Sequence, residues 1–339
     1  MSRSFKLAVV GATGAVGRQL LEILDERDFP VGELCLLGSE ESDGEFLEFR
    51  NEEYLVQQLS DEAFVGTHIV LFCATPACTR QFAPLAAAAG AVCIDCSGAF
   101  NGDTEVPLVI PEVNPEVVGS YRNRGVIANP GSAVIPLVMA LAPLHAESPI
   151  RRLEVSTYQA VSAWGQKGID ELRLQCGELL NGRPCDSKVF PHQIAFNCLP
   201  AIGAFQDNGY SSEEMSLINE TRRILGDESI RISATAVQVP VFFGHSEAVS
   251  LETTVAIPLE RAKELLAAAP GIDLVDDLAD GLYPLPIEAA GQDQVLVGRL
   301  RTHIASPDGL NLWLAADNLR KGVATNAVQI AELLIERYL

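Results

Sequence analysis

Short apolar runs alternate with amphipathic runs through the first 130 residues. Five of the apolar runs have the length of buried strands, at 5–10, 33–37, 68–74, 91–96 and 125–128. The stretch at 18–26 and an alanine-rich stretch that ends near Gly90 have helical spacing. Strands that alternate with helices build a parallel sheet covered on both faces. The pattern therefore predicts an α/β fold that begins with a Rossmann-type, doubly wound parallel sheet.

From Arg152 onward the strands become longer and alternate more regularly between apolar and polar residues. Strands are expected at 153–160, 233–239, 248–257, 294–301 and 310–316, and helices at 169–180, 212–225 and 259–268. This pattern predicts an α+β domain with a mainly antiparallel sheet, whose open face can serve a partner subunit. We expect a first domain at 1–131, completed by a C-terminal helix at 318–339, and a second domain for substrate binding and dimerisation at 132–317.

A glycine turn links the first strand to the first helix. The sequence Gly-Ala-Thr-Gly-Ala-Val-Gly at 11–17 follows the apolar run at 5–10 and precedes the helical run at 18–26. Glycines at such a turn let the backbone approach a pyrophosphate group and let helix and strand pack closely. The spacing is GxxGxxG rather than GxGxxG, so the strand and helix around the turn carry the prediction of dinucleotide binding.

Acidic residues follow the second predicted strand, where a Rossmann unit reads the adenosine ribose. Glu40 or Glu41 there would suit a ribose diol and repel a 2′-phosphate; alternatively, both are solvated loop charges. Asp95 and Ser97 come at the carboxyl end of another predicted strand, where parallel sheets bind ligands.

Ser132 stands where the strand at 125–128 turns through Asn129-Pro130-Gly131 into an apolar, helical run reaching His145. A reactive group at a helix start would lie near amide groups that favour negative charge. Serine is also a common N-cap, and the local sequence favours that interpretation.

Composition narrows the class of protein. With 48% hydrophobic residues in 339, the chain can bury a substantial core. Its 24 basic and 45 acidic residues give a net charge of −21, which disfavours binding to nucleic acid or to anionic membranes. The first residues lead straight into a strand with no apolar signal segment, so we expect a cytoplasmic protein.

The eight cysteines lie mostly in apolar runs, as is typical of reduced, buried thiols. Cys93 and Cys96 have CxxC spacing, but strand alternation points them to opposite faces. No redox or metal site is therefore expected.

Ten motifs together resemble the aspartate-semialdehyde dehydrogenase family along nearly the whole chain. They are GATGAVG at 11–17, LGSEESDG at 37–44, IDCSGAF at 94–100, PLVIPEVN at 107–114, ANPGS at 128–132, STYQAVS at 156–162, EEMSLINETRRIL at 213–225, VPVFFGHSEA at 239–248, VGRLR at 297–301 and ADNLRKGVATNAVQIAE at 316–332. The resemblance implies reductive dephosphorylation of aspartyl phosphate with NADPH, through a cysteine thiolate and an acid/base histidine.

The chain departs from the family at its anion-binding and nucleophilic positions. The family cysteine falls on Ser132 and the asparagine before it on Gly131, while the two cations of the phosphate site fall on Asn101 and Ser216. The carboxylate-binding arginine falls on Gln238, a small residue falls on Trp164, and the arginine of the SxRS stretch falls on Glu41. These departures resemble the USG-1 type of paralogue, which keeps the fold without the catalytic cysteine.

Other family positions are retained. Gln159 and His245 match the substrate-side glutamine and the acid/base histidine, and Ser132 holds the nucleophile position. The residues expected at the cofactor are Gly11, Thr13, Gly14, Ala15, Val16, Ser39, Glu41, Ser42, Ser97 and Asn318. The resemblance thus implies a homodimer that binds NAD or NADP, with NAD favoured by Glu41, and that lacks the phosphorylating dehydrogenase activity.

Three alternatives remain open. One is an oxidoreductase acting with NAD(P) on an aldehyde or oxo group of another substrate. The second is a hydrolase in which His245 activates Ser132 and Glu247 orients the imidazole. If His245 has no role in chemistry, it is instead interpreted as a polar loop residue retained for packing. The third is a pure interaction protein, paired with itself or a related subunit.

Overall fold

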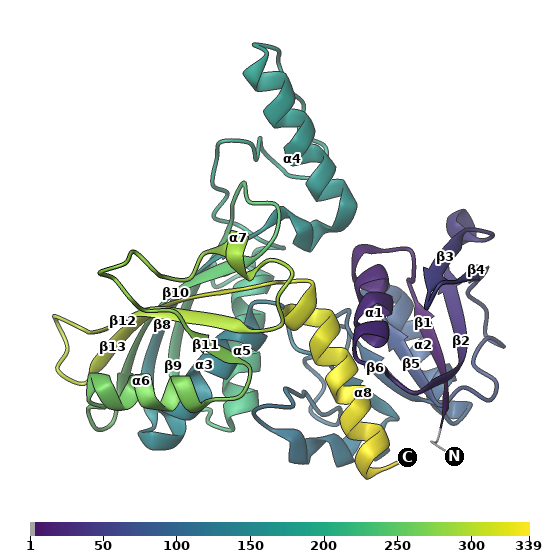
Figure 1. Ribbon diagram of the computed structural model, residues 1–339, viewed down its shortest axis with the longest axis horizontal. Helices are drawn as coiled ribbons and strands as arrows, with labels where there is room; N and C mark the ends of the chain where they lie inside the picture. The colour runs from purple at the N-terminus through teal and green to yellow at the C-terminus, as the bar shows by residue number, and fades with distance from the viewer. Residues whose placement is uncertain (1–3) are drawn as a thin grey trace. The chain divides into compact units, whose positions relative to one another are not determined.

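A computed structural model describes residues 4–339 as two compact units. The first consists of the chain up to Pro130 together with Val323–Leu339, and the second is Gly131–Gly322 (Figure 1). No helix within residues 4–339 combines the length and apolar character needed to cross a lipid bilayer.

The first unit is built on a seven-stranded sheet with the order β3-β4-β2-β1-β5-β6-β7. The strands are β1 (Phe5–Val10), β2 (Val31–Gly38), β3 (Phe46–Phe49), β4 (Glu52–Gln58), β5 (Ile69–Phe72), β6 (Val92–Asp95) and β7 (Val126–Ala128). All neighbouring pairs are parallel except the β3–β4 hairpin at the edge. This is the predicted Rossmann-type sheet, and the edge hairpin is an element that the sequence pattern did not predict.

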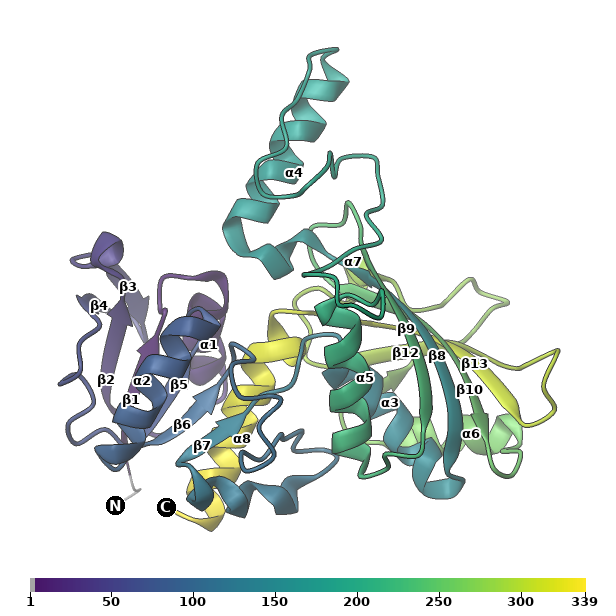
Figure 2. The same ribbon diagram turned by 180° about the vertical axis from the view of Figure 1, so that it is seen from behind.

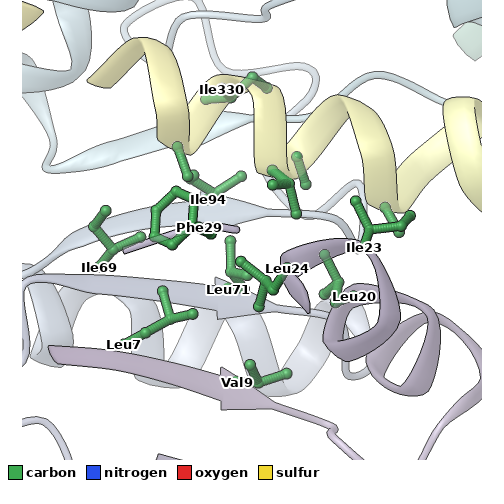
Figure 3. Close-up of a cluster of buried hydrophobic side chains, with 14 of the residues drawn as sticks. Leu7, Val9, Leu20, Ile23, Leu24, Phe29, Ile69, Leu71, Ile94 and Ile330 are labelled. Atoms are coloured by element: carbon green, nitrogen blue, oxygen red, sulfur yellow. The ribbon is translucent and has the colours of Figure 1, made fainter. Parts of the chain in front are cut away.

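Helices cover both faces of this sheet. α1 (Ala15–Glu26) and α8 (Thr325–Arg337) share one core with the strands, which Figure 3 shows as Leu20, Ile23, Leu24 and Ile330 gathered around Leu7, Ile69, Leu71 and Ile94. α2 (Pro76–Ala88) is capped by Thr75 and contacts β5 and β6. Two short 3-10 helices, η1 (Glu40–Ser42) and η2 (Pro115–Asn123), complete the unit.

The second unit is built on a six-stranded mixed sheet with the order β11-β12-β13-β10-β8-β9. The strands are β8 (Ile150–Gln159), β9 (Arg231–Gln238), β10 (His245–Thr253), β11 (Ile272–Leu274), β12 (Val295–Thr302) and β13 (Gly309–Ala316). The three central pairings are antiparallel, and the two outer pairings, β11 with β12 and β8 with β9, are parallel. The prediction of a mainly antiparallel sheet is confirmed.

Three helices pack on one face of this second sheet: α3 (Val134–Glu147), α5 (Ser212–Leu225) and α6 (Leu259–Ala268) (Figure 2). The opposite face has a depression of about 720 Å³, lined by Ser156, Thr235, Ala248 and Trp313 among others. η3 (Val161–Trp164) leads into α4 (Gly165–Leu180), which packs with the chain that returns through Phe190, and α7 (Pro286–Ala289) is a single turn.

Several predicted boundaries differ from those of the structure, and two of them lie next to residues expected at the site. The strand expected at 248–257 begins three residues earlier, because Gly244 turns with a φ of +86° and brings His245 into register with Ala316. The final helix does not begin at 318, since a π-helical turn, η4 (Arg320–Ala324), precedes α8. Such turns are frequent at functional sites.

Candidate functional site

The glycine turn of the first unit brings backbone segments so close together that side chains are excluded. Gly11 adopts a φ of +85°, and a Cβ there would lie 2.9 Å from the backbone of Cys73 and Ala74. A Cβ at Gly17 would lie 2.4 Å from the Gly11 carbonyl. The N-cap of α1 is Gly14. In α1, residues 15–26, no side chain caps the first turn and no acidic residue lies in it. The amides of the turn from Gly11 to Val16 therefore fit an anionic cofactor group.

The residues expected at the adenosine ribose follow β2. Glu40 and Glu41 begin η1 and are exposed, while Ser42 is buried with its Oγ 3.3 Å from the Oγ of Ser39. Ser42 fits beneath Gly38, where a Cβ would approach its hydroxyl to 2.5 Å. The serines thus shape the turn, and the glutamate side chains are free to meet solvent or a ligand.

Ser97 shapes the loop at the carboxyl end of β6. The carboxylate of Asp95 accepts hydrogen bonds from the Ser97 amide at 2.8 Å, the Ser97 hydroxyl at 2.6 Å and the Phe100 amide at 2.9 Å. Burial raises the pKa of Asp95, and these hydrogen bonds partly oppose the rise.

The two cysteines at β6, Cys93 within the strand and Cys96 directly after it, pack into the interior of the first unit. The Cys93 thiol donates to the Ala83 carbonyl of α2 at 3.4 Å, whereas Cys96 packs against the core shared by α1 and α8. The two thiols therefore face opposite sides of the sheet, as strand alternation predicts. Burial raises the pKa of Cys93 to about 12, so its thiolate form is scarce at neutral pH.

Ser132 is not a helix cap. The cap of α3 is Ala133, which makes no side-chain cap bond, and the Ser132 Oγ lies 3.2 Å from Nε2 of His245 instead. The preceding amide, that of Gly131, donates to Oε2 of Glu220 at 2.9 Å. The local prediction of an N-cap is wrong because the imidazole, brought by β10, provides a tertiary partner that the local sequence does not contain.

His245 is the first residue of β10 and is 1% exposed, so its interpretation as a polar loop residue is also wrong. Its Nδ1 accepts the Ala160 amide proton at 3.1 Å, and burial lowers the pKa of the imidazole to about 3. A neutral ring whose Nδ1 accepts must carry its proton on Nε2. Nε2 therefore donates to the Ser132 hydroxyl and cannot take its proton.

A series of hydrogen bonds, each donated in the same direction, leads to the contact between His245 and Ser132. The Trp164 indole donates to Gln238 Oε1 at 2.8 Å, and Gln238 Nε2 donates to the Gln159 carbonyl at 2.6 Å. That carbonyl belongs to the same peptide group as the Ala160 amide, which donates to His245. Donors that point the same way along a chain polarise one another. Trp164 and Gln238, two of the residues where the sequence analysis expects departures from the resembled family, thus connect to the imidazole.

The side chain of Gln159 binds acidic and hydroxyl partners. Its Nε2 donates to Glu213 Oε1 at 2.9 Å and to Thr157 Oγ1 at 3.3 Å. Burial raises the pKa of Glu213, and the hydrogen bond from Gln159 partly opposes the rise. Gln159 therefore anchors a carboxylate of α5 to the end of β8.

Glu247 is a fully buried carboxyl group on the same face of β10 as His245, opposite Thr157. Neither of its oxygens has a hydrogen-bond partner within residues 4–339. Burial, and then the charge of Glu213, hold the pKa of Glu247 well above its usual range. It does not orient the imidazole, whose Nδ1 is bound to Ala160, so the proposed serine hydrolase arrangement is wrong.

Asn318 holds two turns of the second unit together. Its Oδ1 accepts from the Ser162 hydroxyl and the Gly244 amide, both at 3.0 Å. Gly322, in the following π-helical turn, allows close packing, because a Cβ there would lie 3.2 Å from the Cβ of Ser132. No group of three or more histidine, cysteine or acidic side chains within residues 4–339 is arranged to hold a metal ion.

The sequence identified Ser132, His245 and Gln159, and the structure brings all three together in the second unit. Glu247 was identified only as the acid of a possible hydrolase, and Glu213 was not identified as a site feature. No local signal marks Glu213, because its position beside β8 depends on how α5 packs on the sheet.

Comparisons with known proteins agree with this architecture. Residues 6–121 match the family model described as "Semialdehyde dehydrogenase, NAD binding domain", and residues 141–321 match "Semialdehyde dehydrogenase, dimerisation domain". The chain is 48% identical to the aspartate-semialdehyde dehydrogenase of Aquifex aeolicus, over 98% of both chains. It is also 48% identical to aspartate-semialdehyde dehydrogenase 2 of Vibrio cholerae, over the whole of both chains.

Solved structures show the same similarity. The crystal structure of aspartate semialdehyde dehydrogenase II from Vibrio cholerae, complexed with ASA, superposes with a TM-score of 0.97 at 47% identity and covers 100% of both chains. A probable aspartate-semialdehyde dehydrogenase from Pseudomonas aeruginosa gives a TM-score of 0.94 at 39% identity, covering 99% of this chain and 100% of the other. The chain belongs to the aspartate-semialdehyde dehydrogenase family.

Proposed function

We propose that this chain is a dinucleotide-binding homodimer of the USG-1 type that lacks the phosphorylating semialdehyde dehydrogenase activity. The observation that carries this proposal is the direction of one hydrogen bond. His245 donates its Nε2 proton to Ser132, so the hydroxyl at the nucleophile position has no base to activate it.

The chemistry of the hydroxyl supports the proposal. A thiol beside an imidazole N–H donor is readily held as thiolate, whereas a serine hydroxyl stays protonated near neutral pH. An oxygen ester is also less activated than a thioester toward hydride or phosphate. Cys93 does not replace the missing thiol, because it is buried in β6 of the first unit with its pKa raised to about 12.

The residues at the family's anion-binding positions also support it. Gln238 is 2% exposed, and its side-chain amide is already hydrogen-bonded to the Trp164 indole and the Gln159 carbonyl. Ser216, on α5, carries no charge, and neither does Asn101 in the first unit. Each charge-assisted hydrogen bond lost to an anionic substrate weakens binding by roughly 1.5–3 kcal/mol.

We further propose that NAD is preferred over NADP. The exposed carboxylates of Glu40 and Glu41 follow the second strand of a Rossmann-type sheet, where acidic side chains suit a ribose diol and repel a 2′-phosphate. The homodimer would form through the uncovered face of the second sheet, around Ala248 and Trp313.

A second candidate function keeps the hydride chemistry on a different substrate. The Nε2 proton of the neutral His245 is a donor that could stabilise the oxygen of an uncharged aldehyde or oxo group. This alternative needs no nucleophile at Ser132.

The test is turnover and cofactor binding measured on one preparation. Calorimetric titration with NAD and NADP is expected to show binding, stronger for NAD, while aspartate semialdehyde with phosphate and NAD(P)+ is not turned over above background. Turnover at ordinary enzyme rates, about 1–10³ per second, would refute the proposal. Reduction of uncharged aldehydes with NADH would favour the second candidate.

A further inference from the structure

Two cysteines directly follow the neighbouring strands β5 and β6, beside the glycine turn, and the proposed function uses neither thiol. We propose that Cys73 and Cys96 form a disulfide by exchange with a low-molecular-weight disulfide such as oxidised glutathione. The new bond would loosen the glycine turn and weaken dinucleotide binding there. The effect on binding rests on the proposed function, in which the dinucleotide binds at this turn.

The strand pairing brings the two cysteines beside each other. Phe72 and Asp95 are the last paired residues of the parallel strands β5 and β6, and the Cys96 amide donates to the Phe72 carbonyl at 2.8 Å. Cys73 and Cys96 are the next residues of the two segments. Neighbouring strands lie about 4.8 Å apart, and a disulfide joins Cα atoms about 4.4–6.8 Å apart. The backbone therefore needs little movement to accept this disulfide.

Both thiols lie on the same face of the sheet. Cys73 and Cys96 pack against the hydrophobic core that the strands share with α1 and α8. Leu71 and Ile94, two places earlier in each strand, belong to that core, as Figure 3 shows. Both cysteines are partly exposed, so a small reagent can reach them. Cys93 is buried and bonded to α2 on the opposite face, so it is no alternative partner.

The Cys73 thiol also supports the glycine turn. It donates to the Val10 carbonyl at 3.0 Å and lies 3.6 Å from the Gly11 carbonyl oxygen. A Cβ at Gly11 would lie 2.9 Å from the Cys73 backbone, so the turn rests directly on this residue. Disulfide formation removes the thiol proton and draws the sulfur toward β6, so the turn loses its donor. The amides that fit a pyrophosphate would then be less firmly held.

The exchange balances with one molecule of oxidised glutathione. One cysteine thiolate attacks it and releases a glutathione thiol, and the second cysteine thiolate attacks the mixed disulfide and releases another. The two cysteines lose two electrons and two protons, which the two glutathione thiols carry away. Burial raises the pKa of Cys73 to about 12, and burial, followed by the charge of Cys73, holds the pKa of Cys96 well above its usual range. Exchange is therefore slow, but the disulfide is stable, because the reduced pair is not stabilised as thiolate.

The experiment equilibrates the full-length protein for hours in glutathione buffers that range from fully reduced to fully oxidised. Peptide mass spectrometry locates the disulfide and distinguishes it from bound glutathione, and calorimetry measures NAD binding. Hydrogen exchange at residues 11–16 reports on the turn without any cofactor. Cys96→Ser removes one thiol of the pair and keeps its size. Cys78→Ser tests the other thiol near Cys73, and Cys198→Ser is the control for exposed thiols.

Oxidation of the native chain, Cys78→Ser and Cys198→Ser is expected to link Cys73 to Cys96. It should weaken NAD binding about 10-fold or more and speed exchange of the turn amides, and dithiothreitol should reverse both changes. Cys96→Ser should keep the binding and exchange of the reduced native chain wherever mass spectrometry finds no bound glutathione. If Cys96→Ser fails to fold, judged by circular dichroism, Cys96→Ala takes its place.

The inference would be overturned by the absence of this disulfide, by a disulfide between Cys73 and Cys78, or by the same losses in unmodified Cys96→Ser. Turn amides that exchange alike in both redox states, or NAD binding that the disulfide leaves unchanged, would overturn it as well. Failure of the reduced chain to bind either dinucleotide would instead overturn the proposed function. The mapped disulfide and the exchange of the turn would still decide the inference, because neither measurement needs a cofactor.

Discussion

The Nε2 of His245 lies 3.2 Å from the Ser132 hydroxyl and donates to it, because the Ala160 amide occupies the other ring nitrogen. In this tautomer the Ser132 hydroxyl has the position of a nucleophile but no neighbouring base to activate it. The hydroxyl stands where the family resemblance places a thiol, but the imidazole beside it is a donor and not a base.

Replacing the Ser132 hydroxyl by a thiol tests whether a more acidic group at this position becomes reactive. In Ser132→Cys, the His245 donor should stabilise the thiolate, so the new thiol is expected to react with iodoacetamide faster than the buried Cys93. Dehydrogenase turnover should stay at background under the proposed function, since Gln238 and Ser216 still stand where the resemblance implies cations.

Adding Gln238→Arg and Ser216→Lys to Ser132→Cys is expected to raise turnover by about 10- to 100-fold for each restored cation. If Ser132→Cys alone gave full activity, cations at positions 216 and 238 would not be needed for dehydrogenase turnover.

The indole of Trp164 contributes to the fixed tautomer through Gln238. Trp164→Phe keeps the aromatic contact with Phe190 but leaves Gln238 Oε1 without its donor. We expect a loss of about 1–3 kcal/mol in the free energy of unfolding, measured by urea denaturation, and a change in the ¹⁵N shifts of the His245 ring. Trp313→Phe, on the uncovered sheet face, is the matched control and should leave those ring shifts unchanged.

The buried Glu247 predicts how stability depends on pH. Its pKa is held well above the usual 4.5, so between that value and the raised one the native state keeps a proton that the unfolded state has lost. The stabilisation from this proton is fully present below pH 4.5 and is lost as pH rises through the raised pKa. Glu247→Gln should therefore unfold at higher urea concentration than the native chain at pH 8, with a smaller difference at pH 4.5. An equal difference at both pH values would show that Glu247 is ionised in the native state.

Glu41 is predicted to discriminate between the cofactors. Glu41→Arg should strengthen NADP binding relative to NAD by about 10-fold or more, because the guanidinium can pair with the 2′-phosphate. Glu40→Arg, its exposed neighbour in η1, tests whether position or only charge matters. The same change in both variants would indicate that long-range charge alone sets the preference.

Much of the fold could be predicted because local patterns decide it. The apolar runs of the first unit became β1, β2, β5, β6 and β7, and the helix predicted at 212–225 is α5 with unchanged bounds. The hairpin of β3 and β4 was missed because its turn uses positive φ at Arg50 and Asn51, which ordinary residues seldom adopt.

The sequence by itself determined which residues could take part in chemistry: the glycine turn at Gly11, a serine at 132, and neutral residues at 216 and 238. Only the tertiary structure decided what Ser132 does. The proton of His245 is placed by an amide 85 residues away, and that peptide group is in turn bound by Gln238. Hydrogen-bond direction and the burial of Glu247 depend on how strands β8 and β10 pair and how α5 packs on them, and no local pattern encodes such pairings.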